Sequence, residues 1–366
     1  MADAKMILHD VLQNGRIVTK EEALELYRTA SCGELAFVAD SLRRRVVPNA
    51  DVVTWQIDRN INTTNVCISS CRFCNFHAKP HQTKKHFITS IDEYIKKTNE
   101  LIEKGGDQIL LQGGLHPKLG IEYYESLFRE LKAAFPQIKL NALGAPEISH
   151  IARLSSISTL EVLRRLKKAG LDTLPGAGAE ILSSRVRKII SPAKPSVEEW
   201  IRVMQEAHTL DIASTATMMY GSVESVEERI DHLFILRDIQ ERKPASSKGF
   251  TAFIPWIYLS RGTELEKMGY KTKFSPTEYL RIIAISRIIL YNIPNIQASI
   301  LTVGIPTAQM ALHSGANDLG SILLEEHVVS SAGDTCRLDR NMMEGVIRGA
   351  GFTPRLRDQL YNYREI

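Results

Sequence analysis

The strongest constraint on this chain is a set of three cysteines within one short segment. Cys67, Cys71 and Cys74 follow the spacing C-x3-C-x2-C, and the aromatic residue Phe73 directly precedes the third cysteine. Three thiolates this close together form a site for a soft metal. The preceding segment, 59–66, predicts a β-strand. The cysteine loop should therefore leave the carboxyl end of a strand, where (β/α) barrels carry their chemistry.

The number of neighbouring cysteines narrows the kind of metal site. Thiolate is the usual ligand of iron–sulfur clusters, and a four-iron cluster normally takes four cysteines. Only three stand together here, because Cys32 and Cys336 lie far away in the sequence. A cluster held by three cysteines leaves one iron open for an outside ligand. The alternative is a zinc site in which His77 is the fourth ligand, although zinc sites typically use two separated ligand pairs. Disulfides fit less well, because the cysteine count is odd.

Composition excludes several classes of protein. The 366 residues are 44% hydrophobic and 24% charged, which is typical of a soluble globular protein. No apolar run is long enough to span a membrane, and the net charge of +4 is too weak to indicate a nucleic-acid partner. The basic segment 79–86 is either a solvated loop or a surface that attracts an anionic substrate. Free cysteines and the lack of an apolar leader favour a reducing, cytoplasmic location.

Strand and helix patterns alternate along most of the chain, which predicts an α/β fold with a parallel sheet. Helices are expected between the strands, and the predicted strands are 59–66, 108–111, 138–142, 171–174, 212–219, 250–254, 296–301 and 318–321. Eight such strands suggest a closed (β/α)8 barrel of the TIM type. A six-strand partial barrel is the alternative, because several of these strands are very short.

Three regions are expected around this pattern. Residues 1–50 form a helical extension, in which Thr19–Glu22 has a capping-box pattern, residues 51–325 form the barrel, and residues 326–366 form a helical tail packed on it. Glu325–His327 could bind metal, but adjacent helical side chains point in different directions, which favours a structural role.

Two further segments follow predicted strands and are candidates for the site. Gln112, Gly113 and Gly114 come after strand 108–111, and glycines at a strand end let the backbone approach a ligand closely. Glu180, in the segment PGAGAE after strand 171–174, is either the acid that begins the next helix or a hydrogen-bond or proton acceptor in the barrel mouth. Trp256, after strand 250–254, fits an aromatic wall or core packing equally well.

The cysteine spacing, with an aromatic residue before the third cysteine, resembles that of the radical S-adenosylmethionine (SAM) enzymes. The segments NTTNVCISSCRFCNF, LLQGGLHP, AGLDTLPGAGAEIL, ATMMYGSVES and GFTAFIPW extend the resemblance over about residues 59–321. They are similar to the branch that contains the menaquinone enzymes of the futalosine route and the deazaflavin-cofactor synthases. Within it, AGLDTLPGAGAEIL, ATMMYG and FTAFIPW look most like dehypoxanthine futalosine cyclases. Aminofutalosine synthases usually have leucine where this chain has Trp256.

This resemblance implies roles for the candidate residues. The three cysteines would hold a [4Fe-4S] cluster, and SAM would bind its open iron. The backbone of Phe73 would contact adenine, and Gln112–Gly114 would hold the methionine end. Glu180 would make a polar contact to SAM or act as the base. One departure is Leu115, which replaces the acid of the Gly-Gly-Glu common in the family, so that only the backbone role is expected here.

The resemblance also implies a reaction. A 5′-deoxyadenosyl radical would take the ribose C4′ hydrogen of dehypoxanthine futalosine, and the carbon radical would close onto the substrate's own benzoate ring. The enzyme would be an oxidoreductase of menaquinone biosynthesis, with a nucleoside-derived substrate and an electron donor such as flavodoxin or ferredoxin. The protein could also form a homodimer. The rivals are an aminofutalosine synthase, a deazaflavin-cofactor synthase and a zinc-stabilised barrel that binds a metabolite.

Replacing Cys71 with alanine is expected to abolish both cluster binding and turnover, because it removes one of three iron ligands. Anaerobic reconstitution followed by iron analysis should give about four irons per parent chain. Turnover retained by the variant would contradict the assignment of the cluster.

Overall fold

The computed structural model describes residues 3–325 and 338–365. Cys336, Glu326 and His327 lie outside these ranges, so the expectations about them stay predictions. The proposed division of the chain at residues 50 and 325 also stays a prediction.

The main sheet has seven parallel strands in the order β2-β3-β4-β5-β6-β7-β8. The strands are β2 (Asp58–Asn62), β3 (Gln108–Gln112), β4 (Lys139–Ala142), β5 (Thr173–Leu174), β6 (Ala213–Tyr220), β7 (Phe250–Ile257) and β8 (Asn295–Ile296). Neighbours in the sheet are also neighbours in sequence, as expected for repeated strand–helix units. All seven lie within or beside predicted strands.

A second, three-stranded parallel sheet continues the barrel wall. Its order is β10 (Thr353–Leu356), β1 (Val52–Gln56) and β9 (Asp318–Ser321). β1 runs through Ile57 into β2, and an isolated bridge joins Gln297, just after β8, to Asp318 of β9. Backbone hydrogen bonds from the Asn317 N–H to the Ile296 carbonyl and from the Leu324 N–H to the Asp58 carbonyl place β9 between β8 and β2. The predicted α/β fold with a TIM-type barrel of parallel strands is therefore confirmed for the described residues. The expected strand 296–301 stops early because helix α13 (Ile300–Val303) begins there.

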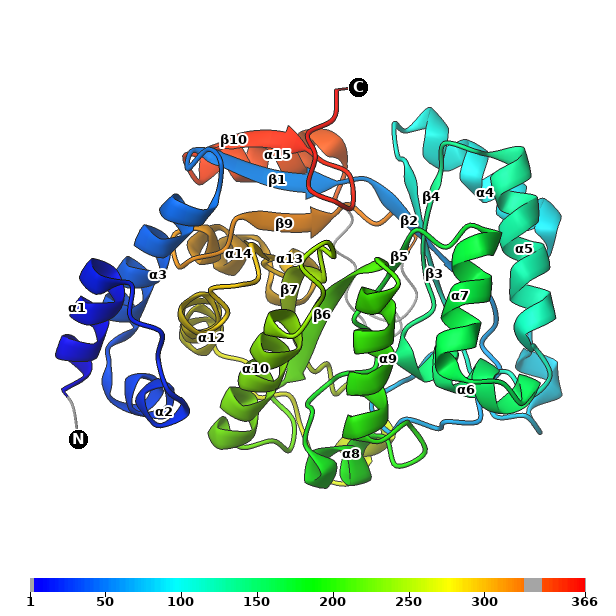
Figure 1. Cartoon of the computed structure of the whole chain (residues 1–366), viewed down its shortest axis with the longest axis horizontal. Helices are drawn as coiled ribbons and strands as arrows, with labels where there is room; N and C mark the ends of the chain where they lie inside the picture. Colours follow the sequence, from blue (N-terminus) through cyan, green and yellow to red (C-terminus); the bar gives the residue numbers. More distant parts are fainter. Residues whose placement is uncertain (1–2, 326–337, 366) are drawn as a thin grey trace.

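Helices cover the outer face of the main sheet (Figure 1). The helices that follow β2 include, in chain order, α4 (Ile91–Glu103), α5 (Ile121–Ala134), α6 (Ala145–Ser155), α7 (Thr159–Ala169), α8 (Ser184–Ile190), α9 (Val197–Thr209), α10 (Val226–Glu241), α11 (Glu264–Lys267), α12 (Pro276–Ile289) and α14 (Ile305–Leu312). The short helices α6, α8 and α11 were not predicted from the sequence.

The two ends of the chain pack on this barrel. The amino-terminal helices are α1 (Ala4–Asn14), α2 (Lys20–Thr29) and α3 (Cys32–Val46), and α2 and α3 contact α10 and α12. The predicted capping box is confirmed: the Thr19 side chain accepts from the Glu22 N–H, and the Glu22 carboxylate accepts from the Thr19 N–H. The tail contains α15 (Arg340–Gly349) and then β10, a strand that was not predicted.

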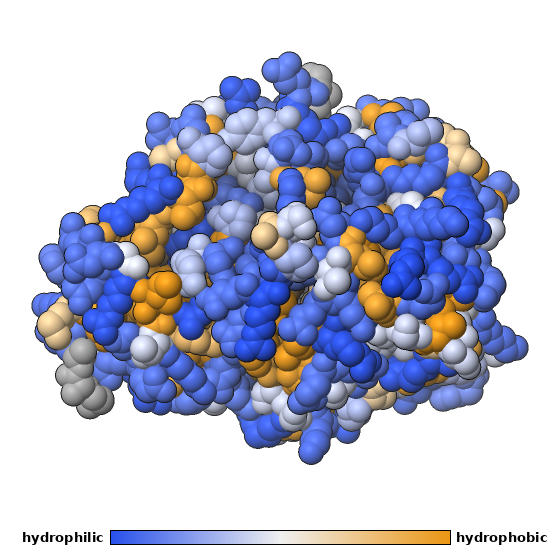
Figure 2. Space-filling view, in the orientation of Figure 1, coloured by the Kyte–Doolittle hydropathy of each residue, from blue (hydrophilic) through white to orange (hydrophobic). Residues whose placement is uncertain are grey.

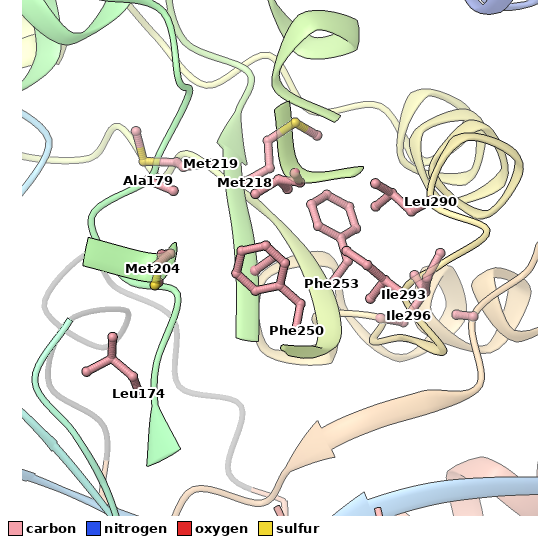
Figure 3. Packing of buried hydrophobic residues seen from close by; sticks show 14 of the residues in the cluster. Leu174, Ala179, Met204, Met218, Met219, Phe250, Phe253, Leu290, Ile293 and Ile296 are labelled. Carbon is pink, nitrogen blue, oxygen red and sulfur yellow. The ribbon is translucent and has the colours of Figure 1, made fainter. Parts of the chain in front are cut away.

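A continuous apolar core lies between the sheet and its helices. Alternate residues of each strand face outward into this layer, as Ile61, Leu111 and Leu140 do. Figure 3 shows Phe253 of β7 near Leu290 and other residues of the same cluster. The outer surface in Figure 2 is mostly hydrophilic, with hydrophobic residues in separate patches. None of the described helices combines the length and apolar character needed to cross a membrane.

A buried histidine ties α10 to the strands near the barrel mouth. His232 accepts a hydrogen bond at Nδ1 from the Leu182 N–H (3.0 Å), which leaves Nε2 to donate to the Thr217 carbonyl (3.1 Å). Burial lowers the pKa of His232 to about 3. The imidazole is therefore neutral in the folded protein, whereas it takes up a proton near pH 6.5 in the unfolded chain.

Acidification should therefore destabilise the protein through His232. The unfolded state binds one more proton than the folded state below about pH 6.5, so the free energy of unfolding falls by about 1.4 kcal/mol per pH unit on this account. Urea unfolding between pH 7 and pH 5 should show a shallower slope for His232→Gln than for the parent. His9→Gln, at an exposed position, is the control and should keep the parent slope. Equal slopes for both variants would show that His232 does not cause the loss of stability on acidification.

Candidate active site

A cavity of about 430 Å³ opens beside the carboxyl ends of β2 and β3 and continues into the barrel lumen. It is lined by every residue that the sequence analysis assigned to the site: Cys67, Cys71, Phe73, Cys74, Gln112, Gly113, Gly114 and Glu180. Residues from three segments far apart in the sequence therefore meet at one place, as the barrel prediction required.

Backbone hydrogen bonds hold the cysteine loop against the turn that follows β3. The Gly114 N–H donates to the Thr64 carbonyl (2.7 Å), and the Ile68 N–H donates to the Leu115 carbonyl (3.1 Å). The Cys67 N–H donates to the Ala78 carbonyl (3.0 Å), which closes the loop on itself. The position of the cysteines is thus fixed by main-chain contacts on both sides.

Gly114 is required by this packing. A Cβ atom at this position would lie 2.2 Å from the Val66 carbonyl oxygen, a backbone atom that cannot move aside easily. The position of the glycines after a strand predicts that their backbone lets a ligand approach closely. In the structure, Gly114 lets the backbone of the cysteine loop pack closely against the turn after β3. Gly113 and Gly114 also line the cavity.

The three thiols are suited to a soft metal group. Cys67 and Cys71 are buried, all three are free, and the Ser69 hydroxyl lies 3.3 Å from the Cys71 sulfur. Burial raises the pKa of Cys71 to about 11. A thiol in this setting becomes a thiolate ligand when a metal supplies positive charge. The donor set therefore fits the [4Fe-4S] cluster expected from the spacing.

The zinc alternative fits less well. It needs His77 beside the three sulfurs, but the His77 Nδ1 lies 2.9 Å from the Cys74 carbonyl oxygen. Among residues 3–325 and 338–365, no three histidine, cysteine, aspartate or glutamate side chains converge as ligands of a single ion would. In a cubane each cysteine binds a different iron, so this tight convergence is not required.

Glu180 forms a buried ion pair at the cavity wall. Its side chain is 4% exposed, its Oε1 lies 2.7 Å from the Lys194 ammonium, and its Oε2 lies 3.6 Å from Arg187. Helix α8 begins later, with Ser183 as its N-cap, and Glu180 itself has a left-handed φ of 42°. The expectation that Glu180 begins a helix is therefore wrong, and its charge is balanced by side chains.

Lys194 is a site residue that the sequence analysis missed. Its ammonium lies 5.3 Å from the centre of the Phe73 ring, within range of a cation–π interaction. Burial acts to lower the pKa of Lys194, but the neighbouring Cys71 and Glu180 raise it above its usual range. The prolines at 192 and 195 predict a loop here, and nothing local predicts that the loop folds into the cavity.

Glu147 is a second site residue that the sequence did not reveal. It lies in the first turn of α6, lines the cavity and is 8% exposed. Burial raises the pKa of Glu147 to about 7, although a backbone hydrogen bond from Gly113 and the charge of Lys194 oppose the shift. Unlike Glu180, it forms no ion pair within the described ranges.

Comparisons with known proteins show which family the chain resembles. The model of the radical SAM superfamily matches residues 61–236, and the model of the CofH/MqnC C-terminal region matches residues 247–366. Cyclic dehypoxanthine futalosine synthase of Streptomyces coelicolor is 46% identical over 363 residues, which cover 99% of this chain and 89% of the relative. The 5-amino-6-(D-ribitylamino)uracil–L-tyrosine 4-hydroxyphenyl transferase 1 of Methanosarcina acetivorans is 41% identical over 355 residues, covering 95% and 91%.

A solved structure shows the same fold. The crystal structure of methylornithine synthase superposes with a TM-score of 0.71 at 18% identity, covering 95% of this chain and 97% of that one. Members of the matched superfamily use a [4Fe-4S] cluster and SAM, the group that the three thiols fit. The chain therefore belongs to the radical SAM superfamily, in the group that carries the CofH/MqnC C-terminal region.

Proposed function

We propose that this protein is a cyclase that converts dehypoxanthine futalosine into cyclic dehypoxanthine futalosine in menaquinone biosynthesis. The observation that carries the proposal is the meeting of three free thiols, a Gly-Gly backbone and the Glu180–Lys194 pair around one cavity. The Streptomyces coelicolor relative of this name, which matches almost the whole chain, supports the choice of reaction. Trp256, which distinguishes cyclases from aminofutalosine synthases in the sequence analysis, also lines the cavity.

The residues of the cavity wall take distinct roles in this proposal. Cys67, Cys71 and Cys74 hold the cluster, which with bound SAM supplies a 5′-deoxyadenosyl radical. The backbone of Gln112–Gly114 and the Glu180–Lys194 pair bind the charged methionine end of SAM, since the pair offers both a carboxylate and an ammonium. The Phe73 backbone contacts adenine.

Ring closure needs a group that accepts the proton lost from the aromatic ring. Glu180 was the expected base, but its carboxylate is engaged with Lys194 and Arg187. Glu147 suits this role better, because a general base works best when its pKa lies near the working pH. We therefore assign Glu180 to cofactor binding and Glu147 to the proton transfer.

One second function has specific support. The Methanosarcina acetivorans relative, named as a 4-hydroxyphenyl transferase acting on 5-amino-6-(D-ribitylamino)uracil and L-tyrosine, is only slightly less similar than the cyclase. Both reactions join an aromatic ring to a second carbon framework. The choice between them therefore depends on the substrate.

The proposed setting is the cytoplasm, because a reducing environment keeps thiols free and protects an oxygen-sensitive cluster. A flavodoxin or ferredoxin is the proposed electron donor. The proposal requires neither a nucleic acid nor a membrane as a partner, and a homodimer remains compatible with it.

The proposed reaction predicts a defined change in mass. Reconstituted enzyme incubated without oxygen with SAM, a reductant and dehypoxanthine futalosine should give 5′-deoxyadenosine and a product lighter by about two hydrogens. The substrate would lose one hydrogen atom to the 5′-deoxyadenosyl radical and one proton to Glu147, and the remaining electron would return to the oxidised cluster. Mass spectrometry of the mixture measures both products.

A parallel incubation contains 5-amino-6-(D-ribitylamino)uracil and L-tyrosine in place of dehypoxanthine futalosine. Coupling of these two compounds, with no change in dehypoxanthine futalosine, would support the transferase and rule out the cyclase.

Glu147→Gln should separate radical formation from product formation. The variant should still release 5′-deoxyadenosine, while the cyclised product falls about 100-fold or more, because the proton acceptor is lost. In the parent, product formation should rise as the pH increases through about 7, where Glu147 ionises.

Infrared titration of the cluster-free protein gives an independent measurement. It should show a carboxyl group that titrates near pH 7 in the parent and is missing in Glu147→Gln. Glu180→Gln is the matched variant and should weaken SAM binding instead. A Glu147→Gln variant with parental product yield would remove Glu147 from the mechanism.

A further inference from the structure

The barrel lumen has an unusually polar wall. Because side chains alternate along a strand, Asp58, Asn60 and Asn62 of β2 all face inward and line the cavity. The same face of β3 and β4 presents Gln108 and Asn141. Barrels of this type usually fill the lumen with branched apolar side chains. Here most inward positions of three adjacent strands carry amides, beside Asp58 and Leu110. We call Asn60, Asn62, Gln108 and Asn141 the amide wall.

These amides have hydrogen-bonding capacity that the described residues do not use. The Asn62 Nδ2 donates to the Gln112 carbonyl (3.1 Å), and the Gln108 Nε2 donates to Asp58 (3.3 Å), but neither side-chain oxygen has a partner. Asn60 makes only one long side-chain contact, which it accepts from Asn62 at 3.5 Å. Buried polar atoms normally find partners, so the amide wall is built to bind a polar group.

The charges of the cavity indicate which kind of polar group fits. Its two buried cations are already engaged, since Lys194 binds Glu180 and Arg357 binds both carboxylate oxygens of Asp318 at 2.6 and 2.9 Å. Among the residues that the structure describes, an anion would therefore find no free positive charge beside the amides. A side-chain amide both donates and accepts, as a hydroxyl group does. Neutral hydroxyl groups of a sugar match this wall.

A different wall lies three strands further along the sheet. Ile254 and Trp256 of β7 face the same cavity and are partly exposed to it. Their inward neighbours on β6, Thr215 and Thr217, are small. A tryptophan beside an aliphatic side chain offers a flat apolar surface for an aromatic ring. We call Ile254 and Trp256 the apolar wall.

We propose that the amide wall binds the ribosyl hydroxyl groups of the substrate and that the apolar wall packs against its aromatic ring. This inference rests on the proposed function and deepens it. Held between two unlike walls, the substrate has one favoured orientation, with the ribosyl carbon and the ring on opposite sides of the lumen. Orientation of this kind favours the internal ring closure over escape of the carbon radical.

SAM also carries a ribosyl group, which could bind the same amides. The distance of each amide from the cofactor-binding turn therefore decides whether its substitution affects the substrate or SAM. Gln108 lies five residues before Gly113, which is about 16 Å along the chain from the Gly113–Gly114 turn. Asn60 lies two residues before Asn62, at the middle level of the lumen. Substitutions at Asn60 and Gln108 therefore test the substrate more than the cofactor.

The test uses reconstituted holoenzyme without a reductant, so that ligands bind but do not react. Isothermal titration gives the dissociation constants of dehypoxanthine futalosine and of SAM for the parent and for Asn60→Leu, Gln108→Met and Trp256→Leu. Each variant should weaken binding of dehypoxanthine futalosine about tenfold, because a buried hydrogen bond or a ring contact is lost. SAM binding should change less than twofold.

Two controls separate binding from folding. Gln309→Met makes the same chemical change as Gln108→Met in α14, outside the cavity, and should bind both ligands like the parent. Iron content and melting temperature show whether each variant folds. Asn60→Leu removes the fewest protein contacts and keeps the test valid if Gln108→Met is unstable.

A second titration tests the amide wall and the apolar wall separately. With an acylbenzoate that lacks the ribosyl group as the ligand, Trp256→Leu should weaken binding while Asn60→Leu leaves it unchanged. Loss of affinity for SAM in place of the substrate, or parental substrate affinity in all three variants, would overturn the inference and leave the proposed function standing. Failure of the parent itself to bind dehypoxanthine futalosine would overturn both.

Discussion

The backbone contact between the cysteine loop and the turn after β3 is the constraint on which the site depends. The Gly114 N–H donates to Thr64 at 2.7 Å, and no side chain fits between Gly114 and the Val66 carbonyl. This contact fixes the cysteine loop at the carboxyl ends of two adjacent strands, so that the thiols face the lumen. The chain thereby places a metal site by main-chain geometry, which is more rigid than a site held by side chains alone.

Two carboxylates of the same cavity illustrate how surroundings assign roles. Glu180 is held by Lys194 and Arg187, so its carboxylate is paired and oriented at the cavity wall. Glu147 is equally buried but has no ion pair in the described structure, and burial raises its pKa to about 7. A carboxylate paired with cations suits binding, whereas a buried carboxyl group whose pKa lies near 7 suits proton transfer. The amide wall is a further case of surroundings matched to a role. Its neutral amides can bind hydroxyl groups without the free-energy cost of burying a charge.

The sequence predicted the parts of this structure that depend on local pattern. The cysteine spacing, the strand before it and the capping box at Thr19 are all set by residues close together in the chain. Lys194 and Glu147 could not be assigned, because their roles arise only when distant loops meet. β10 was missed because its partner, β1, lies at the other end of the chain. The alternation Asp58, Asn60, Asn62 was visible, but alternation alone does not say which face of a strand is the lumen.

SAM binding and radical formation depend most on one iron that receives no ligand from the protein. Electron–nuclear double resonance of the reduced cluster, with SAM labelled at its amino nitrogen, tests this directly. If SAM binds the open iron, the spectrum will show a nitrogen coupling to the cluster that changes with the isotope in SAM. A coupling that ignores the label and follows a protein nitrogen, such as that of His77, would show the fourth iron already occupied and would contradict the account.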